Sequence, residues 1–113
     1  MKNKIDMQEL DNKLIRLGFR DNIAGTQMIR VAVQEWYPGI SMTKELYPAI
    51  AEELHSSASR VERAMRHAIT TAFDRGSVST INSLFGYTIS AEKGTPTVGE
   101  FVARMARVCA VED

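Results

Sequence analysis

Residues 50–65 have the sequence IAEELHSSASRVERAM, and this run carries the clearest structural signal in the chain. Its apolar positions are Ile50, Ala51, Leu54, Val61 and Met65. The first three fall on one face of a short helix, and the polar residues 55–57 form a tight turn whose serines can cap a second helix. The last two return apolar side chains to the same core. This order of elements matches a helix-turn-helix unit, whose second helix enters the DNA major groove.

The predicted second helix, residues 58–75, separates apolar from cationic side chains. At about 100° per residue, with Arg60 at zero, the arc from about 40° to about 180° holds Val61, Ala64, Met65, Ala68, Ile69 and Ala72. The arc from about 240° to about 360° holds Ser59, Arg60, Arg63, Arg66, His67 and Thr70. Glu62 lies at the border, at about 200°. We expect Val61, Met65, Ala68, Ile69 and Ala72 to be buried and the three arginines to be exposed.

The cationic face carries the residue types that recognise DNA. Arginine forms bidentate hydrogen bonds with guanine O6 and N7, and a glutamate such as Glu62 can accept a hydrogen bond from cytosine N4. Together with Ser56 and Ser57, the dipole at the start of the helix favours a nearby phosphate. A charged helical face is more commonly a solvated surface. Three arginines directly after a helix-turn-helix turn nevertheless favour a helix that contacts bases.

The rest of the chain also predicts helices, with glycine and proline at their ends. We expect them over residues 6–17, 22–37, 43–54, 77–84 and 97–110. Pro48 lies inside the third range, so either a helix starts there or the helix is kinked. The run TVGE at 97–100 has the form of a capping box, and Gly18 suits the position just after a helix. Because no segment alternates as a strand would, the sequence predicts one all-α domain of about six helices over residues 1–113.

Length and composition are those of a globular domain. The chain has 113 residues and a mass of 12.6 kDa, with 44% apolar and 25% charged residues. Its 14 basic and 14 acidic side chains give no net charge, so a role with nucleic acid depends on how the charge is distributed. No apolar run approaches the roughly 18 residues of a membrane span, and the first residues lack the apolar centre of a signal peptide. We therefore expect a cytoplasmic protein.

Patterns typical of catalysis and metal binding are not found in the sequence. There is no Ser-His-Asp or Cys-His arrangement, glycine-rich phosphate loop or pair of acids, so we expect neither enzymatic activity nor a cofactor. Cys109 is the only cysteine, which excludes an internal disulfide and a cysteine-based zinc site, and we interpret it as a small apolar core residue. His55 and His67 have no carboxylate or thiol at ligand spacing, so we expect no metal and interpret them as phosphate or capping contacts.

Longer motifs extend this unit over nearly the whole chain. They are SASRVERAMRHAI at 57–69, GxxxxIxG at 18–25, TKxLYPxIA at 43–51, RGxxxxIxSLFGYT at 75–88 and KxxPTxxEF at 93–101. In this combination they resemble the C-terminal effector domain of the stage-zero sporulation protein A family, response regulators of endospore-forming bacteria. The full set is far more specific than a helix-turn-helix alone.

The resemblance implies a six-helix bundle that binds a TGTCGAA-type operator box, commonly as head-to-tail copies on adjacent boxes, and that activates or represses transcription. By matching position, it implies base recognition by Arg60, Glu62 and Arg63. It implies contacts to bases or backbone by Arg66 and His67. It implies contacts to the DNA backbone by Ser57, Ser59 and Lys93. Residues 75–87 match the region associated with the sigma subunit of RNA polymerase.

The family's regulators also carry an N-terminal receiver domain with a phosphoacceptor aspartate. This sequence begins near the first effector helix, and Asp6 and Asp11 fall in a short amphipathic helix rather than beside a parallel sheet. We therefore expect no receiver domain and no dimerisation driven by phosphorylation. A stand-alone effector controlled by abundance or by a partner, and a fragment of a longer protein, both stay open.

A second class of function stays open as well. The chain could keep the fold as an interaction module that binds a regulator or RNA polymerase without needing DNA. The arginine face favours the DNA-binding class, because an interaction module has no physical reason to keep Arg60, Arg63 and Arg66 free of acids.

Overall fold

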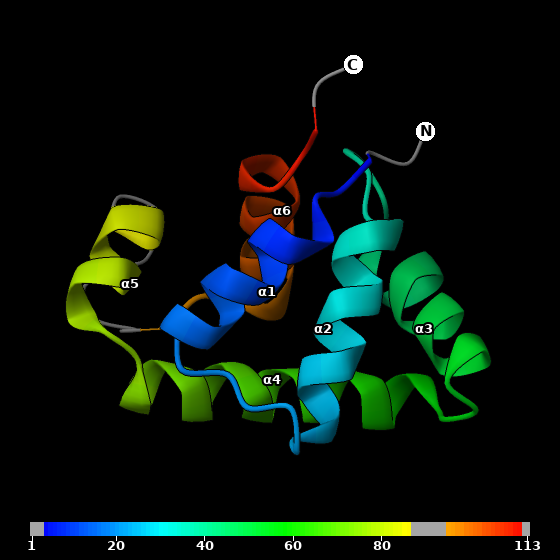
Figure 1. The fold of residues 1–113 in the computed structure, drawn as a ribbon. Coiled ribbons are helices and arrows are strands. Elements are labelled where there is room, and N and C mark those ends of the chain that lie inside the picture. The colour runs from blue at the N-terminus through cyan, green and yellow to red at the C-terminus, as the bar shows by residue number, and fades with distance from the viewer. Residues whose placement is uncertain (1–3, 87–94, 112–113) are drawn as a thin grey trace.

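The computed structural model describes residues 4–86 and 95–111, and Figure 1 shows how the helices are arranged. They are α1 (Met7–Arg16), α2 (Ala24–Glu35), the π-helical turn η1 (Met42–Leu46), α3 (Tyr47–Glu53), α4 (Ala58–Arg75), α5 (Val78–Phe85) and α6 (Val98–Val108). The described residues contain no strand, and one antiparallel bridge pairs Ile5 with Ala110. The prediction of an all-α fold with about six helices is confirmed.

Side-chain caps start several helices at the places the sequence predicts. The Asp6 side chain accepts a hydrogen bond from the Glu9 backbone N–H at 3.0 Å and begins α1. At α6, Thr97 and Glu100 cap each other's backbone N–H groups, so the predicted capping box is confirmed. Gly18 follows α1 with a φ of +99°, a left-handed conformation that glycine adopts without steric cost.

The helix predicted over residues 43–54 is divided in two. Its first part is η1, where the Ser41 side chain accepts a hydrogen bond from the Lys44 N–H at 3.1 Å. Its second part is α3, in which Pro48 occupies the first turn directly after η1. The alternatives for Pro48 were a helix start and a kink, and the structure shows an α-helix that starts beside it. The π-helical turn before it was not predicted.

α4 lies along one side of the molecule, with α1, α2 and α6 above it (Figure 1). Its most extensive packing is against α2, and it also contacts α3 and α6. Gly25 of α2 faces the backbone of α4: a Cβ atom at this position would lie 2.1 Å from the Ala64 carbonyl oxygen and 2.8 Å from the Ala68 Cβ. Because only glycine allows this approach, α2 sets the position of α4 in the fold.

The inner face of α4 is the one the helical pattern predicts. Its residues Val61, Met65, Ala68, Ile69 and Ala72 are all buried. They pack into a core that also includes Cys109, which is 1% exposed, in agreement with its interpretation as a core residue. The burial of these side chains holds α4 rigidly and leaves its opposite face in solvent.

Aromatic rings join the C-terminal part of the bundle. The Phe101 ring lies 5.2 Å from that of Phe19 and 5.4 Å from that of Phe85, measured between centroids. The Arg104 Nε donates a hydrogen bond to the Leu84 carbonyl oxygen at 2.8 Å. These contacts attach α5 to α6 at the edge of the molecule, beyond the end of α4.

Candidate nucleic-acid interface

The turn between α3 and α4 gives the helix-turn-helix its shape. His55 has a φ of +54°, a left-handed conformation that is uncommon for residues other than glycine. The Ser56 N–H donates to the Ala51 carbonyl oxygen at 2.8 Å, which closes the end of α3. The chain therefore reverses within a few residues and starts α4 across the end of α3.

Ser57 is the residue that caps α4. Its Oγ accepts a hydrogen bond from the Arg60 N–H at 3.3 Å, and the Oγ atoms of Ser57 and Ser59 lie 3.5 Å apart. Of the two serines able to cap this helix, the structure uses Ser57 and leaves Ser56 half-buried. Two exposed hydroxyls thus lie beside the helix N-terminus, where the helix dipole favours an anion.

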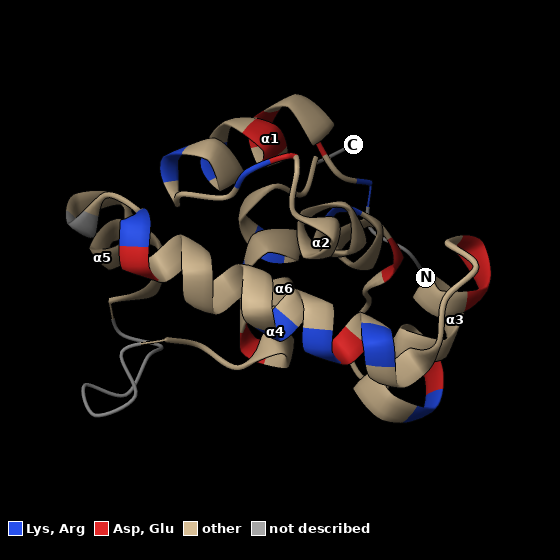
Figure 2. Cartoon of the chain, turned by 90° about the horizontal axis from the view of Figure 1, so that it is seen from below, with Lys and Arg blue, Asp and Glu red and all other residues tan. Residues whose placement is uncertain are grey.

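The outer face of α4 is fully accessible. Its exposed residues are Ser59, Arg60, Arg63, Arg66, His67 and Thr70. Figure 2 shows most of the basic residues of α4 along the half next to α3, with an acidic residue among them, while another basic residue lies at the end next to α5. Within the described residues, Arg60 and Arg63 form neither an ion pair nor a side-chain hydrogen bond, so both guanidinium groups can bind an outside partner.

A shallow hollow runs along this face. Arg63, Arg66, His67 and Thr70 surround it, and the half-buried Ala64 also lines it. The Thr70 Oγ1 donates a hydrogen bond to the Arg66 carbonyl oxygen at 3.0 Å, which fixes the threonine side chain against the helix. Ala64 belongs to the apolar arc of the helical wheel, and its place at the edge of that arc, at about 40°, explains why it is only half-buried.

The expectation that the arginine face is free of acids is wrong for Arg66. Its Nη1 lies 3.0 Å from the Glu62 Oε1, and their side chains are 62% and 31% exposed, respectively. The reason is helical spacing, since residues four apart lie one above the other and opposite charges there attract. Glu62, at the border of the two faces, therefore reaches onto the cationic side.

A second carboxylate, that of Asp74, marks where the cationic face ends along α4. Asp74 is exposed and lies at about 320° on the same wheel, between the directions of Arg63 and His67. It follows Arg63 by three helical turns, or about 16 Å. Its place on this face was not predicted from the sequence. The cationic and hydroxyl groups of this face thus lie before Asp74, and Glu62 is the acid that reaches onto them from the border.

A known protein family matches most of the chain. The family described as "Sporulation initiation factor Spo0A C terminal" matches residues 10–108, nearly the whole chain. The chain belongs to this family. It is therefore a DNA-binding transcription regulator of the sporulation type, and the family is a regulatory one rather than a known family of enzymes. The roles of individual side chains stay predictions.

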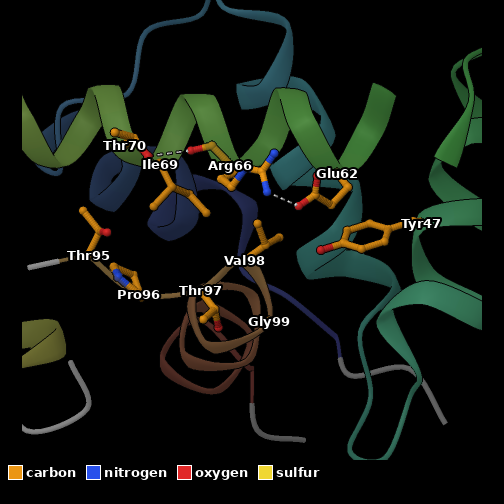
Figure 3. A pocket seen from close by; sticks show the side chains of 10 residues that line it. All are labelled: Tyr47, Glu62, Arg66, Ile69, Thr70, Thr95, Pro96, Thr97, Val98 and Gly99. Atoms are coloured by element: carbon orange, nitrogen blue, oxygen red, sulfur yellow. Dashed lines mark hydrogen bonds and ion pairs between the residues drawn. The ribbon is translucent and has the colours of Figure 1, made fainter. Parts of the chain in front are cut away.

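Beside α4, this Spo0A-family chain has a pocket of about 400 Å³, drawn in Figure 3. It lies between α4, the start of α6 and the first residue of α3, Tyr47. The Glu62–Arg66 pair forms one wall, and Thr97 and Gly99 lie opposite. Burial raises the pKa of Tyr47, and the negative charge of Glu62 raises it further, while Arg66 opposes the shift.

Other cations of the Spo0A-family chain have separate roles or positions. Arg30 donates from Nε to Asp11 at 2.6 Å and from Nη2 to Asp21 at 2.7 Å, and these hydrogen bonds raise its pKa. Arg30 thus attaches α2 to α1 and to the loop after it. Lys93, for which the sequence predicts a backbone contact, and Tyr87, at the end of the predicted sigma region, lie outside the described residues.

Neither a metal site nor a membrane-spanning helix is found in the part of the chain that the structure describes. There, no three His, Cys, Asp or Glu side chains come together as metal ligands would. No helix there is both long and apolar enough to cross a membrane.

Proposed function

We propose that this chain regulates transcription in the cytoplasm by placing α4 in the major groove of a TGTCGAA-type box. The observation that carries the proposal concerns Arg60 and Arg63. Their guanidinium groups have no partner among the described residues, and they lie on the exposed face of a helix whose opposite face is buried. One helical turn apart, they are separated by a rise of about 4.5 Å, close to the roughly 3.4 Å between successive base pairs. Each arginine can therefore form hydrogen bonds with a different guanine.

The neighbouring residues complete base recognition. Glu62 accepts a hydrogen bond from a cytosine N4, and Arg66 and His67 contact bases or the backbone near the end of the surface. The hollow between the arginines, with Ala64 and the Thr70 methyl group, accepts a thymine methyl group. Arg66 is held by Glu62 in the free protein, so its contact with DNA requires that this pair open.

Backbone contacts position the helix without reading sequence. The exposed hydroxyls of Ser57 and Ser59 lie at the N-terminus of α4, where a phosphate is favoured. Lys93 is the third predicted backbone contact. With no net charge on the chain, these contacts are few, and one domain binds DNA weakly.

Two further partners fit this proposal. A second copy on an adjacent box adds affinity that one weakly binding domain lacks. The sigma subunit of RNA polymerase is the partner proposed for residues 75–87. Support comes from α5, which stands at the edge of the molecule (Figure 1) and, together with α1, lines a hollow that includes Lys13 and Arg16.

Fluorescence anisotropy with a labelled duplex tests the proposal. The duplex carrying the TGTCGAA-type box should bind much more tightly than a scrambled duplex of the same composition, and the preference should persist as salt is raised. Equal binding of both duplexes would reject sequence recognition. Absence of binding to any DNA would instead support the interaction-module alternative.

A further inference from the structure

Tyr47 has an unusual environment for a tyrosine. Its side chain is only 7% exposed, yet its hydroxyl forms no hydrogen bond with any described residue. The hydroxyl end is turned into the pocket beneath Glu62 (Figure 3). Buried tyrosine hydroxyls usually find a partner. Because no fully buried side-chain oxygen or nitrogen in the described part of the chain lacks one, this oxygen must touch the solvent of the pocket.

The charges around the pocket indicate which kind of group this hydroxyl can bind. Among the described residues, the pocket wall holds one cation, Arg66, and one anion, Glu62, and the carboxylate of Glu100 already caps the start of α6 nearby. Two carboxylates disfavour a bound anion. What the pocket does contain is a carboxylate whose present partner is a solvent-exposed arginine, together with a hydroxyl donor that has no acceptor.

DNA binding changes the situation of Glu62. When Arg66 turns to DNA, a carboxylate that is only 31% exposed loses its ion pair. The cytosine N4 proposed as its partner in the complex is one neutral donor, so the half-buried charge is less well compensated than in the ion pair, and this cost would be subtracted from the affinity for DNA. A hydroxyl that donates to Glu62 in the complex removes part of the cost. Tyr47 is a donor without a partner among the described residues, and the fold aims it into this pocket beneath Glu62.

We propose that Tyr47 is a positioning residue for DNA binding: its hydroxyl donates a hydrogen bond to Glu62 when Arg66 leaves this carboxylate for DNA. The proposal rests on the proposed function. Tyr47 itself touches no DNA. It keeps Glu62 satisfied and oriented during the exchange, and so allows Arg66 to be released.

Substitution by phenylalanine removes only the hydroxyl, and the chain offers a matched control. Tyr47→Phe should weaken binding to the TGTCGAA-type box about tenfold, as expected for a lost hydrogen bond to a charged group, and should leave the melting temperature of the free protein unchanged. Tyr37→Phe should instead lower the melting temperature and leave the affinity for DNA unchanged, because the Tyr37 hydroxyl donates to the Glu45 Oε2 at 2.7 Å in the free protein. Unchanged affinity for Tyr47→Phe would overturn the proposal.

A double-mutant cycle separates this role from simple packing. In a Glu62→Ala background no carboxylate needs the hydroxyl, so adding Tyr47→Phe should change DNA affinity less than about twofold. A packing role for Tyr47 would produce the same loss in both backgrounds, and that result would overturn the proposal.

A third measurement needs no DNA. In Arg66→Ala, Glu62 is already unpaired, so Tyr47 should donate to it in the free protein. Tyr47→Phe should then lower the melting temperature in the Arg66→Ala background and not in the wild type. Failure of the wild type to prefer the TGTCGAA-type box would count against the proposed function alone. An equal effect of Tyr47→Phe on melting in both backgrounds would count against the exchange itself.

Discussion

Gly25 of α2 lies so close to Ala64 of α4 that a Cβ atom on Gly25 would stand 2.1 Å from the Ala64 carbonyl oxygen. The backbones of α2 and α4 are thus in direct contact where the two helices cross, behind the face of α4 that carries the arginines. Ala64 precedes Arg66 and follows Arg63 on the same helix, so the position of these side chains depends on a contact in which no side chain of α2 takes part.

Gly25→Ala should therefore destabilise the fold by about 1–3 kcal/mol, because overpacking outweighs the gain in helix propensity. Gly99→Ala is the matched control. Its added Cβ would meet only the Met42 side chain, with Cγ at 3.5 Å and Sδ at 4.0 Å, so its stability should stay the same or rise slightly. Thermal melts followed by circular dichroism compare the two variants. Equal stability of both would contradict the close crossing of α2 and α4.

Val61→Asp tests the inner face of α4. Val61 is 0% exposed, and an unpaired carboxylate there should lower the free energy of unfolding by several kcal/mol. Ser59→Asp adds the same group to the exposed first turn, where a change within about 0.5 kcal/mol is expected. Urea denaturation measures both. If Val61→Asp unfolded at the wild-type urea concentration, the assignment of the helix faces would be wrong.

Glu45 should make stability depend on pH. Its carboxylate accepts hydrogen bonds from the Ser41 N–H at 3.0 Å and the Tyr37 hydroxyl at 2.7 Å, and these lower its pKa from the ordinary value of 4.5. A lowered pKa in the folded state gives a contribution that is present above pH 4.5 and is lost as the pH falls through the folded value. The advantage of the wild type over Glu45→Gln should thus shrink on acidification.

Urea denaturation at several pH values between neutrality and pH about 3 measures this advantage. Glu52→Gln is the control, because Glu52 is exposed and forms no hydrogen bond or ion pair within the described residues. An advantage over Glu45→Gln that stayed constant across the range would show that these hydrogen bonds do not favour the charged form.

Local signals explain why much of this fold is predictable from its sequence. α4 runs over Ala58–Arg75 as expected, because Ser57 can cap it and Gly76 ends it. Its buried face follows from the period of its apolar residues. The start of α6 follows from a capping box that involves only neighbours in the chain.

What the sequence does not predict depends on geometry between side chains or between helices. The wheel places Glu62 at a border, but whether it turns toward Arg66 depends on the rotamers of both residues. The environment of the Tyr47 hydroxyl depends on where the start of α6 lies relative to α4. The π-helical turn η1 runs directly into α3 at Tyr47, and the sequence carries no local signal that distinguishes such a turn from an α-helical one.

Two adjacent boxes should bind the protein better than one. Because the chain has no net charge, a single copy makes few phosphate contacts, and a second copy on the same duplex raises the effective concentration of each. Anisotropy titrations should show an affinity at least about tenfold higher for the two-box duplex. Inserting about five base pairs between the boxes should remove the gain, since it rotates the second site by half a turn. Equal affinity for all three duplexes would indicate independent monomers.

The affinity of Arg63→Ala for two duplexes, one with the TGTCGAA-type box and one scrambled, tests base recognition by α4 most directly. Arg75→Ala removes the same charge from the other end of the helix and is the control. We predict that Arg63→Ala loses about 1–3 kcal/mol on the box and much less on the scrambled duplex, because a guanine contact depends on sequence. Arg75→Ala should change both affinities equally and little. An equal loss on both duplexes for Arg63→Ala would contradict the account, because it would make Arg63 a backbone contact only.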